Sequence, residues 1–443
     1  MSAEGTLDTT IDDVLTLSPE LTEGDSLIKG QIRLYDVDSE ADTLESDAER
    51  FFNRTLLTGG LEDSLKRLRD TRRGEDNNRL HEMYGPYGTG KSHQMVALYH
   101  CFNSPDVVGK WADGRIEGLG EALPDDALPV VVSLQKEQYE YLWEPLFEQL
   151  DYEPDEEEYD EEGGYPSIDV IQDAVGDRTV AFFMDELEDW FGSLSGRRKD
   201  ANRGFLQALF ETTSRPNTEL FAFVSVLREG SDVHDILSRE PERVQVNMSN
   251  QVDIRDVLRH RLVDSIHDRS AMRTLVDQYI EAYADTDYVD LPDGLREEMY
   301  DTYPFHPILI DSLKTRYFAE TESGATRGML YLFAKVLVDQ YQDTDLLTHG
   351  EVDAVEYNDE LTRINVEHSR PDRCYDDIRE RLADADITYG RPILSTVLIY
   401  SLTPGLAEGA TTSDIVIGTY HAGDRINDII VDLERLQGEV YHL

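Results

Sequence analysis

The stretch "MYGPYGTGKSH", residues 83–93, decides the fold. It fits the pattern of a glycine, four residues, Gly-Lys and then Ser or Thr, which runs here from Gly85 to Ser92. Glycines at 85, 88 and 90 can adopt positive φ, so backbone N–H groups can turn inward around phosphate oxygens. Lys91 would contact the β- and γ-phosphates, and the Ser92 hydroxyl would ligate Mg²⁺. A glycine-rich turn without a ligand is the competing interpretation.

The segments on both sides of this stretch favour a phosphate-binding loop. Such a loop follows a strand, and "RLHEMYG" (79–85) has the composition of a short strand. A helix must come next, and "KSHQMVALYHCF" (91–102) has apolar residues on most sides of a helix. The N-terminus of that helix would point at the phosphates, where its dipole favours negative charge. The residues predicted to hold ATP are Gly85, Pro86, Tyr87, Gly88, Thr89, Gly90, Lys91, Ser92 and His93.

A second motif follows about 95 residues later along the chain. "TVAFFMDELEDW" (179–190) is an apolar run that ends in Asp185-Glu186. In a P-loop ATPase such a strand brings the Asp next to the ligands of the magnesium ion, and the Glu polarises the attacking water. A buried strand that ends in an acidic turn is the alternative. Both motifs in this order predict an Mg²⁺-dependent ATPase, with Ser92 and Asp185 at the metal and Glu186 as catalytic base.

The charge of the chain indicates its environment. The 443 residues include 41 Lys+Arg and 92 Asp+Glu, a formal net charge of -51, and the acidic residues are spread along the whole chain. An apolar fraction of 40% favours a folded protein over a disordered one. Concentrated salt shortens the Debye length to about 3 Å at 1 M, which makes such self-repulsion tolerable. We therefore expect a halophilic, cytoplasmic protein, for which overall charge does not exclude DNA as a partner.

The cysteine spacing and the lack of long apolar runs argue against a cysteine metal site and a membrane protein. Cys101 and Cys374 are far apart and fit no metal-ligand spacing, so we expect two reduced thiols. No apolar run approaches the roughly 18 residues of a membrane span, and the N-terminus is acidic where a signal peptide would be basic. No membrane partner is expected.

The rest of the chain predicts a parallel α/β sheet followed by helices. Further strands are expected at 127–134, 219–227 and 243–247, with helices between them, which implies right-handed crossovers. From about residue 251 the strand pattern stops and helical periodicity takes over. Three last helical segments and the beginning of a strand suggest a winged helix. The expected parts are an N-terminal extension (1–78), an ATPase core (79–250), a helical lid (251–358) and a winged-helix-like segment (359–443).

This order of elements resembles the AAA+ subclass of P-loop ATPases. The resemblance implies that Ser225, on the strand after the acidic pair, senses the γ-phosphate. It also implies an arginine finger at the end of the next helix, for which Arg239 and Arg243 are the candidates. Arg327, in a G-x-x-R pattern at a helix start, would be the second-sensor arginine of the lid. Ordinary surface arginines, paired with neighbouring glutamates, are the alternative.

Several stretches also resemble the ATPases of anti-phage islands, among them the PglY/BrxC-type ATPases of BREX systems. These stretches lie at 48–68, 84–100, 303–313, 326–337 and 398–404. The resemblance implies an ATP-dependent homo-oligomer that assembles or remodels a DNA-associated complex with other defence-system proteins. Family members are longer, so the chain is expected to be a split or shortened form. An origin-recognition-like DNA-binding ATP switch and an ATP-binding scaffold without turnover remain as alternatives.

Basic clusters are scarce, so the stretch "SGRRKDANR" (195–203) stands out just after the acidic pair. In AAA+ proteins, loops at this place can face a central pore or a DNA backbone. A solvated turn is the other interpretation.

Overall fold

The computed structural model shows two compact units, which are described separately below: residues 32–252 form one, and residues 1–31 with 253–443 form the other. The residues that it describes are 9–22, 32–37, 43–85, 89–132, 134, 139–154, 164–227, 230–240, 242–248, 254–316, 325–353, 356–357, 360–361, 387–401 and 409–439.

A five-stranded parallel sheet forms the centre of the unit at residues 32–252. Its strands lie in the order β3-β4-β5-β2-β6. The strand that leads into the glycine-rich loop therefore lies between the strand that carries Ser225 and the last strand. The expected α/β fold with a parallel sheet is confirmed. The strands are β2 (Leu80–Tyr84), β3 (Ala127–Val132), β4 (Thr179–Met184), β5 (Leu220–Val226) and β6 (Arg243–Asn247).

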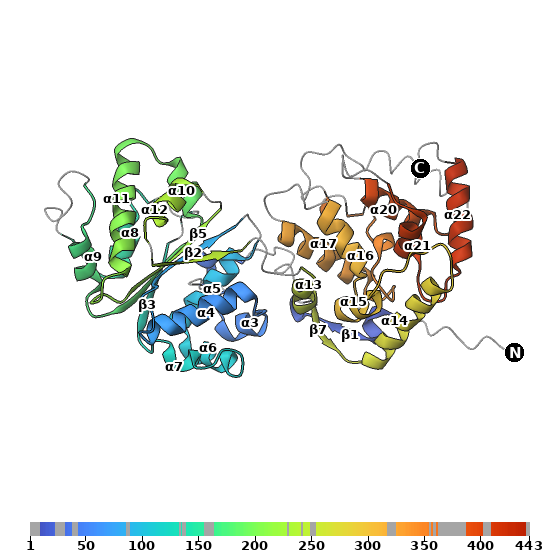
Figure 1. Ribbon diagram of the computed structural model, residues 1–443, viewed down its shortest axis with the longest axis horizontal. Coiled ribbons are helices and arrows are strands. Elements are labelled where there is room, and N and C mark those ends of the chain that lie inside the picture. Colours follow the sequence, from blue (N-terminus) through green and yellow to red (C-terminus); the bar gives the residue numbers. More distant parts are fainter. Residues whose placement is uncertain are drawn as a thin grey trace. The chain divides into compact units, whose positions relative to one another are not determined.

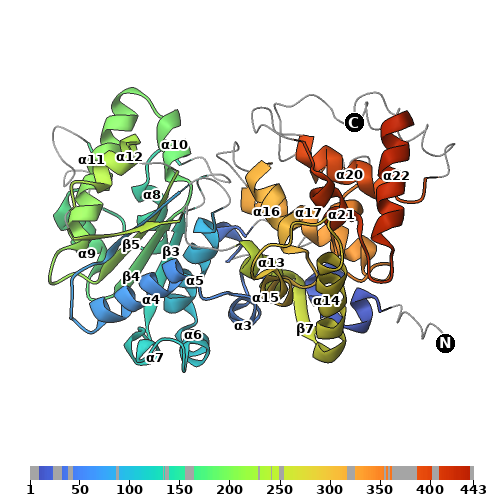
Figure 2. The same ribbon diagram turned by 45° about the vertical axis from the view of Figure 1, so that its right-hand side comes forward.

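Helices cover both faces of this sheet, because its strands carry apolar residues on both sides. Phe182 faces the core on one side, whereas its neighbour Phe183 stacks on Phe223 on the other, with ring centroids 4.7 Å apart. One face is covered by α8 (Trp143–Gln149), α9 (Ile168–Val175), α10 (Leu187–Ser193), α11 (Gly196–Thr213) and α12 (Asp232–Leu237). The other is covered by α3 (Ala48–Asn53), α4 (Gly59–Arg72), α5 (Lys91–Asn103), α6 (Pro105–Ala112) and α7 (Leu119–Ala122), with the short η2 (Leu34–Asp36) nearby (Figures 1 and 2).

The second unit is predominantly helical around one apolar core. Its N-terminal elements are η1 (Ile11–Asp13), β1 (Leu15–Leu17) and α1 (Pro19–Thr22). Its later elements are α13 (Ile254–Leu262), β7 (Val263–Ile266), α14 (Arg269–Ala284), α15 (Leu295–Thr302), α16 (Pro307–Arg316), α17 (Ala325–Gln340), η4 (His349–Glu351), α20 (Gly390–Ser401), α21 (Thr412–Thr419) and α22 (Ile426–Glu439). In the parts of the chain described above, no helix has the length and apolar character needed to cross a membrane.

A short antiparallel pair corrects the expectation that the strand pattern stops at about residue 251 and gives way to helices. Helix α13 ends at Leu262, and residues 263–266 form β7, which pairs with β1. Leu15 and Leu17 of β1 are buried in the helical core, so the start of the chain is part of this unit. A strand this short has no readable period, and its partner lies about 250 residues away, so the sequence pattern could not show the pairing.

The helical C-terminal region is confirmed by α20, α21 and α22, the three helices expected there. The residues where a wing would begin, 440–443, lie outside the described residues, as do 362–386. A winged helix therefore stays a prediction.

Candidate nucleotide-binding site

The glycine-rich loop connects the end of β2 to the start of α5, as the sequence predicts for a phosphate-binding loop. Gly85 follows Tyr84, and Gly90 is the N-cap of α5. Gly90 has φ 93°, a left-handed conformation that favours glycine. Pro86, Tyr87 and Gly88 lie outside the described residues, whereas Thr89 lies within them.

Lys91, at the first position of α5, lies folded back over the loop. Its Nζ donates a hydrogen bond to the carbonyl oxygen of Gly85 at 2.5 Å, and the residue is 8% exposed. Burial lowers the pKa of Lys91 to about 8, although the carboxylates of Asp185 and Glu186 act in the opposite direction. A desolvated cation at the N-terminus of a helix favours an incoming anion.

Three predicted residues from separate elements meet at Asp185. The Ser92 hydroxyl, on α5, donates to Asp185 Oδ2 at 2.7 Å. The Ser225 hydroxyl, on β5, donates to Asp185 Oδ1 at 2.5 Å. Because β4 and β5 are parallel neighbours, their carboxyl ends share one edge of the sheet, and α5 begins at the same edge. The glycine-rich loop and the acidic pair therefore belong to one site.

Glu186 has a backbone conformation that is unusual for its residue type. It is the N-cap of α10 at φ 58° and ψ 29°, in the left-handed region. Its N–H donates to the Ser225 hydroxyl at 3.0 Å and to Asp185 Oδ1 at 3.1 Å. Non-glycine residues in this region are strained and persist where the surroundings hold them, often at functional sites.

His93, the last predicted loop residue, turns its side chain toward α3. The imidazole stacks on Phe51 with ring centroids 4.6 Å apart, and its Nε2 lies 3.2 Å from Thr55 Oγ1. His93 lies in the first turn of α5, and its imidazole packs against α3.

The two finger candidates differ in their contacts. Arg239 follows α12 and is exposed. Arg243, the first residue of β6, donates from Nε to Glu82 Oε2 at 2.9 Å. Glu82 is fully buried on β2 and also lies 2.6 Å from His234 Nδ1. A charge pair with a buried partner is costly to break, so Arg243 is committed to its own chain, and Arg239 is the stronger finger candidate.

Arg327 is the third residue of α17, in the helical unit, so the expected helix start is present. Its side chain lies outside the described residues. Its role stays a prediction.

The basic stretch at 195–203 is not a turn. It forms the beginning of α11. Arg198 donates to the carbonyl oxygen of Glu140 at 2.8 Å, and Lys199 pairs with Asp232 at 2.7 Å. The Nη2 of Arg203 also lies 3.5 Å from Asp232 Oδ1. These side chains tie α11 to α12 and to the segment before α8, and DNA contact by this stretch stays a prediction.

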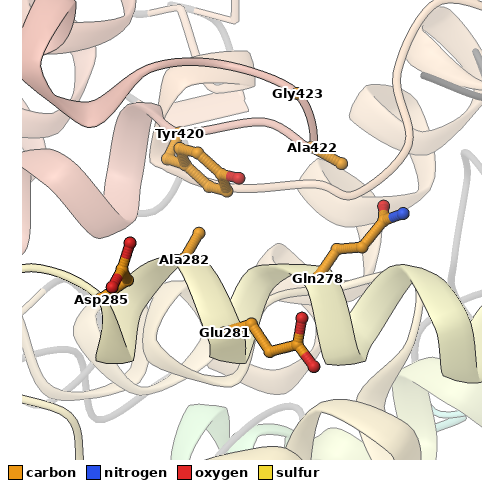
Figure 3. Close-up of a pocket in the computed structure, with 7 residues that line it drawn as sticks. All are labelled: Gln278, Glu281, Ala282, Asp285, Tyr420, Ala422 and Gly423. Atoms are coloured by element: carbon orange, nitrogen blue, oxygen red, sulfur yellow. The ribbon is translucent and has the colours of Figure 1, made fainter. Parts of the chain in front are cut away.

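A pocket of about 520 Å³ in the helical unit contains none of the predicted site residues. Figure 3 shows it between α14 and the loop from α21 to α22. Two carboxylates, Glu281 and Asp285, belong to its lining, which disfavours a phosphate ligand. Its lining residues are Gln278, Glu281, Ala282, Asp285, Tyr420, Ala422 and Gly423.

Glu82 was missed by the sequence prediction, whereas Glu188 was named only as a substitute for Glu186 as the catalytic base. Glu82 lies within an apolar strand, where a charged residue is itself a signal of a buried partner. Glu188 comes two residues after Glu186, and its Oε2 accepts the N–H of Leu227 at 2.9 Å. An acidic residue at this spacing in an acidic protein carries no signal by itself.

Comparisons with known proteins give a family match and similarities to solved structures. The matching family model is the DUF499 N-terminal domain. It covers residues 25–113, which contain β2, the glycine-rich loop and α5. Among solved structures, the chain is similar to the Orc1 protein of Aeropyrum pernix in complex with DNA, at 12% identity and a TM-score of 0.35. That similarity covers 86% of this chain and 84% of the other, and it transfers no residue roles. No curated protein matches.

Proposed function

We propose that this chain binds ATP with Mg²⁺ and hydrolyses it. The observation that carries the proposal is the 2.7 Å hydrogen bond from Ser92 to Asp185. It joins the residue that ends the glycine-rich pattern to the first acidic residue after β4, at the sheet edge where ligands of open α/β sheets bind. Lys91 neutralises phosphate charge, and Glu186 orients and polarises the attacking water.

The donor set fits magnesium. Asp185 supplies a carboxylate and Ser92 a hydroxyl, which are the hard oxygen ligands that Mg²⁺ prefers alongside water and substrate phosphates. When bound, the metal ion neutralises charge on the β- and γ-phosphates. In the described residues, no cluster of three or more His, Cys, Asp or Glu residues offers an alternative metal site.

We further propose that hydrolysis is completed between subunits of a homo-oligomer. Arg243 pairs in register with Leu80 at the start of β2, whereas the glycine-rich loop follows the end of β2. Five strand residues separate these two edges by about 16 Å, since each residue spans roughly 3.3 Å. Arg239 lies in the loop that leads to the first edge, at the opposite edge from the chain's own site, which suits contact with a neighbour's ATP.

The biological setting that fits best is an anti-phage defence system. The resemblance to PglY/BrxC-type ATPases supports it, with other defence-system proteins as partners and a DNA-associated complex as the object of ATP turnover. Purified protein in molar KCl should hydrolyse ATP faster when its partner proteins and DNA are added together. Slow turnover with a DNA complex that persists only while ATP is bound would instead favour the origin-recognition-like switch.

The deciding experiment compares wild type with Glu186→Gln. The variant should bind ATP normally and lose turnover by roughly 10²–10⁴-fold, because positioned-base catalysis contributes about that much. Glu211→Gln, an exposed glutamate paired with Arg215, is the matched control and should retain activity. Hydrolysis that is unchanged in Glu186→Gln contradicts the assignment. Wild type that binds ATP without turnover, with and without partners, would make the chain a scaffold.

A further inference from the structure

Two sets of hydrogen bonds join the acidic turn after β4 to the end of β5. In the first, Ser225 donates to Asp185 and accepts the N–H of Glu186. In the second, the N–H of Leu227 donates to Glu188 Oε2 at 2.9 Å. Each partner in the second set lies two residues beyond its counterpart, Ser225 or Glu186, in the first. The two segments therefore hold each other at two successive points.

The bond to Glu188 lies beyond the end of the strand ladder. The β4–β5 pairing ends at Met184 and Val224, so the backbone of β4 offers Leu227 no partner in that ladder. On this side the Glu188 side chain of α10 takes over this role, whereas on the other side β5 pairs with β2 as far as Val226. A backbone N–H at this place needs an acceptor to be held in one position.

The turn that carries Glu186 depends on the position of β5. Its left-handed conformation is strained, and the Ser225 hydroxyl is one of the two acceptors for its N–H. Ser225 lies on β5 two residues before Leu227, so a shift at the end of that strand would move the hydroxyl. The carboxylate that meets the attacking water would then move with the turn.

We propose that Glu188 is a positioning residue for ATP hydrolysis, which acts by accepting the Leu227 N–H and so keeps Ser225 against the Asp185-Glu186 turn. This inference rests on the proposed ATPase function. The role requires an acceptor oxygen at the right distance. It requires neither negative charge nor proton transfer at residue 188.

Glu188→Gln and Glu188→Asp separate these requirements. Gln keeps the length of the side chain and an acceptor oxygen but removes the charge. Asp keeps the charge but shortens the side chain by one methylene, too short to hold a 2.9 Å bond. We expect Glu188→Gln to keep kcat within about threefold of wild type. Glu188→Asp and Glu188→Ala should lower kcat by about tenfold or more, because a misplaced reacting group can cost about 10²-fold in rate. KM and ATP affinity should stay nearly unchanged in all three variants.

The matched control is Asp189→Ala, which removes a carboxylate from the exposed neighbour on the same helix and should leave kcat within about twofold. Thermal unfolding of every variant in molar KCl completes the set. Equal impairment of Glu188→Gln and Glu188→Asp would overturn the inference in favour of a charge or proton-transfer role. Full activity of Glu188→Ala would overturn it as well. So would variants in which ATP affinity and the thermal unfolding temperature fall in parallel with kcat.

Failure of the proposed function has a different signature. If wild type has no turnover, or Glu186→Gln retains it, the ATPase assignment fails whatever residue 188 does. If Glu186→Gln is inactive and Glu188→Ala is fully active, only the positioning role fails.

Discussion

Ser92 and Asp185 lie 93 residues apart in sequence and 2.7 Å apart in the fold, joined by a hydrogen bond from hydroxyl to carboxylate. Ser225 holds the other oxygen of the same carboxylate. The carboxylate of Asp185 thus has a fixed orientation, because both of its oxygens accept hydrogen bonds. Such preorganisation is what positioned catalysis requires.

The first prediction concerns nucleotide affinity. Lys91→Ala removes the cation predicted to meet the β- and γ-phosphates, so ATP affinity should fall at least tenfold, about 1.4 kcal/mol. Titration with a fluorescent ATP analogue in molar KCl measures it. Lys66→Ala is the control, because Lys66 is an exposed lysine paired with Glu62. Equal affinity in Lys91→Ala and wild type would remove the phosphate-binding assignment.

The second prediction concerns the trans-acting arginine. Arg239→Ala should slow hydrolysis by about 10³–10⁵-fold if it supplies a neighbour's finger. Mixing it with Glu186→Gln should partly restore activity, since mixed assemblies pair an intact acidic site with an intact arginine. Specific activity of wild type should also rise with protein concentration. Flat activity from nanomolar to high micromolar protein with DNA present, together with an inactive mixture, would indicate a monomeric switch.

The third prediction separates Arg243 from Arg239. Arg243→Ala leaves the buried carboxylate of Glu82 without its arginine, so it should lower the free energy of unfolding by about 3–5 kcal/mol. Arg215→Ala, in an exposed pair, should cost no more than about 1 kcal/mol. Denaturant unfolding of both variants tests this. If Arg243→Ala is stable and loses only the hydrolysis that is completed between subunits, Arg243 is the finger instead.

The fourth prediction concerns the helical unit. The Nδ1 of His421 lies 2.6 Å from Asp345 Oδ1, and its Nε2 lies 2.8 Å from Glu351 Oε1. Burial alone would lower the pKa of His421, but the Glu351 and Asp345 carboxylates hold it well above its ordinary value. The charged histidine therefore stabilises the fold fully below its unfolded pKa of about 6.5, and this stabilisation is lost as pH rises through the higher folded pKa.

His421→Gln removes this contribution. The gap between wild type and variant in free energy of unfolding should be largest below about pH 6.5 and should shrink as pH rises. Urea unfolding of both proteins at a series of pH values, below and above about 6.5, measures this difference in free energy. His267→Gln, an exposed histidine whose Nε2 lies 3.1 Å from the carbonyl oxygen of Asp13, is the control and should show no comparable trend. A gap independent of pH would contradict a charged His421.

The short β1–β7 pair and the basic stretch show where sequence patterns end. The residues of β7 continue an apolar stripe, and only the presence of Leu15 and Leu17 beside them makes a strand favourable there. Lys199 belongs to a segment that could equally be a loop facing DNA. Its pairing with Asp232 depends on α12 lying beside α11. Both outcomes depend on neighbours that are distant in sequence.

The sequence by itself determined the parallel α/β sheet, the glycine-rich loop between β2 and α5, and the acidic pair after β4. These features depend on local causes: φ preferences of glycine, apolar runs of strand length and helix periodicity. Tertiary structure alone decided that Arg243 pairs with Glu82 across 161 residues and that Glu188 holds Leu227. Such contacts follow from strand order and helix packing, because a buried carboxylate or N–H takes whichever partner the fold brings within hydrogen-bond distance.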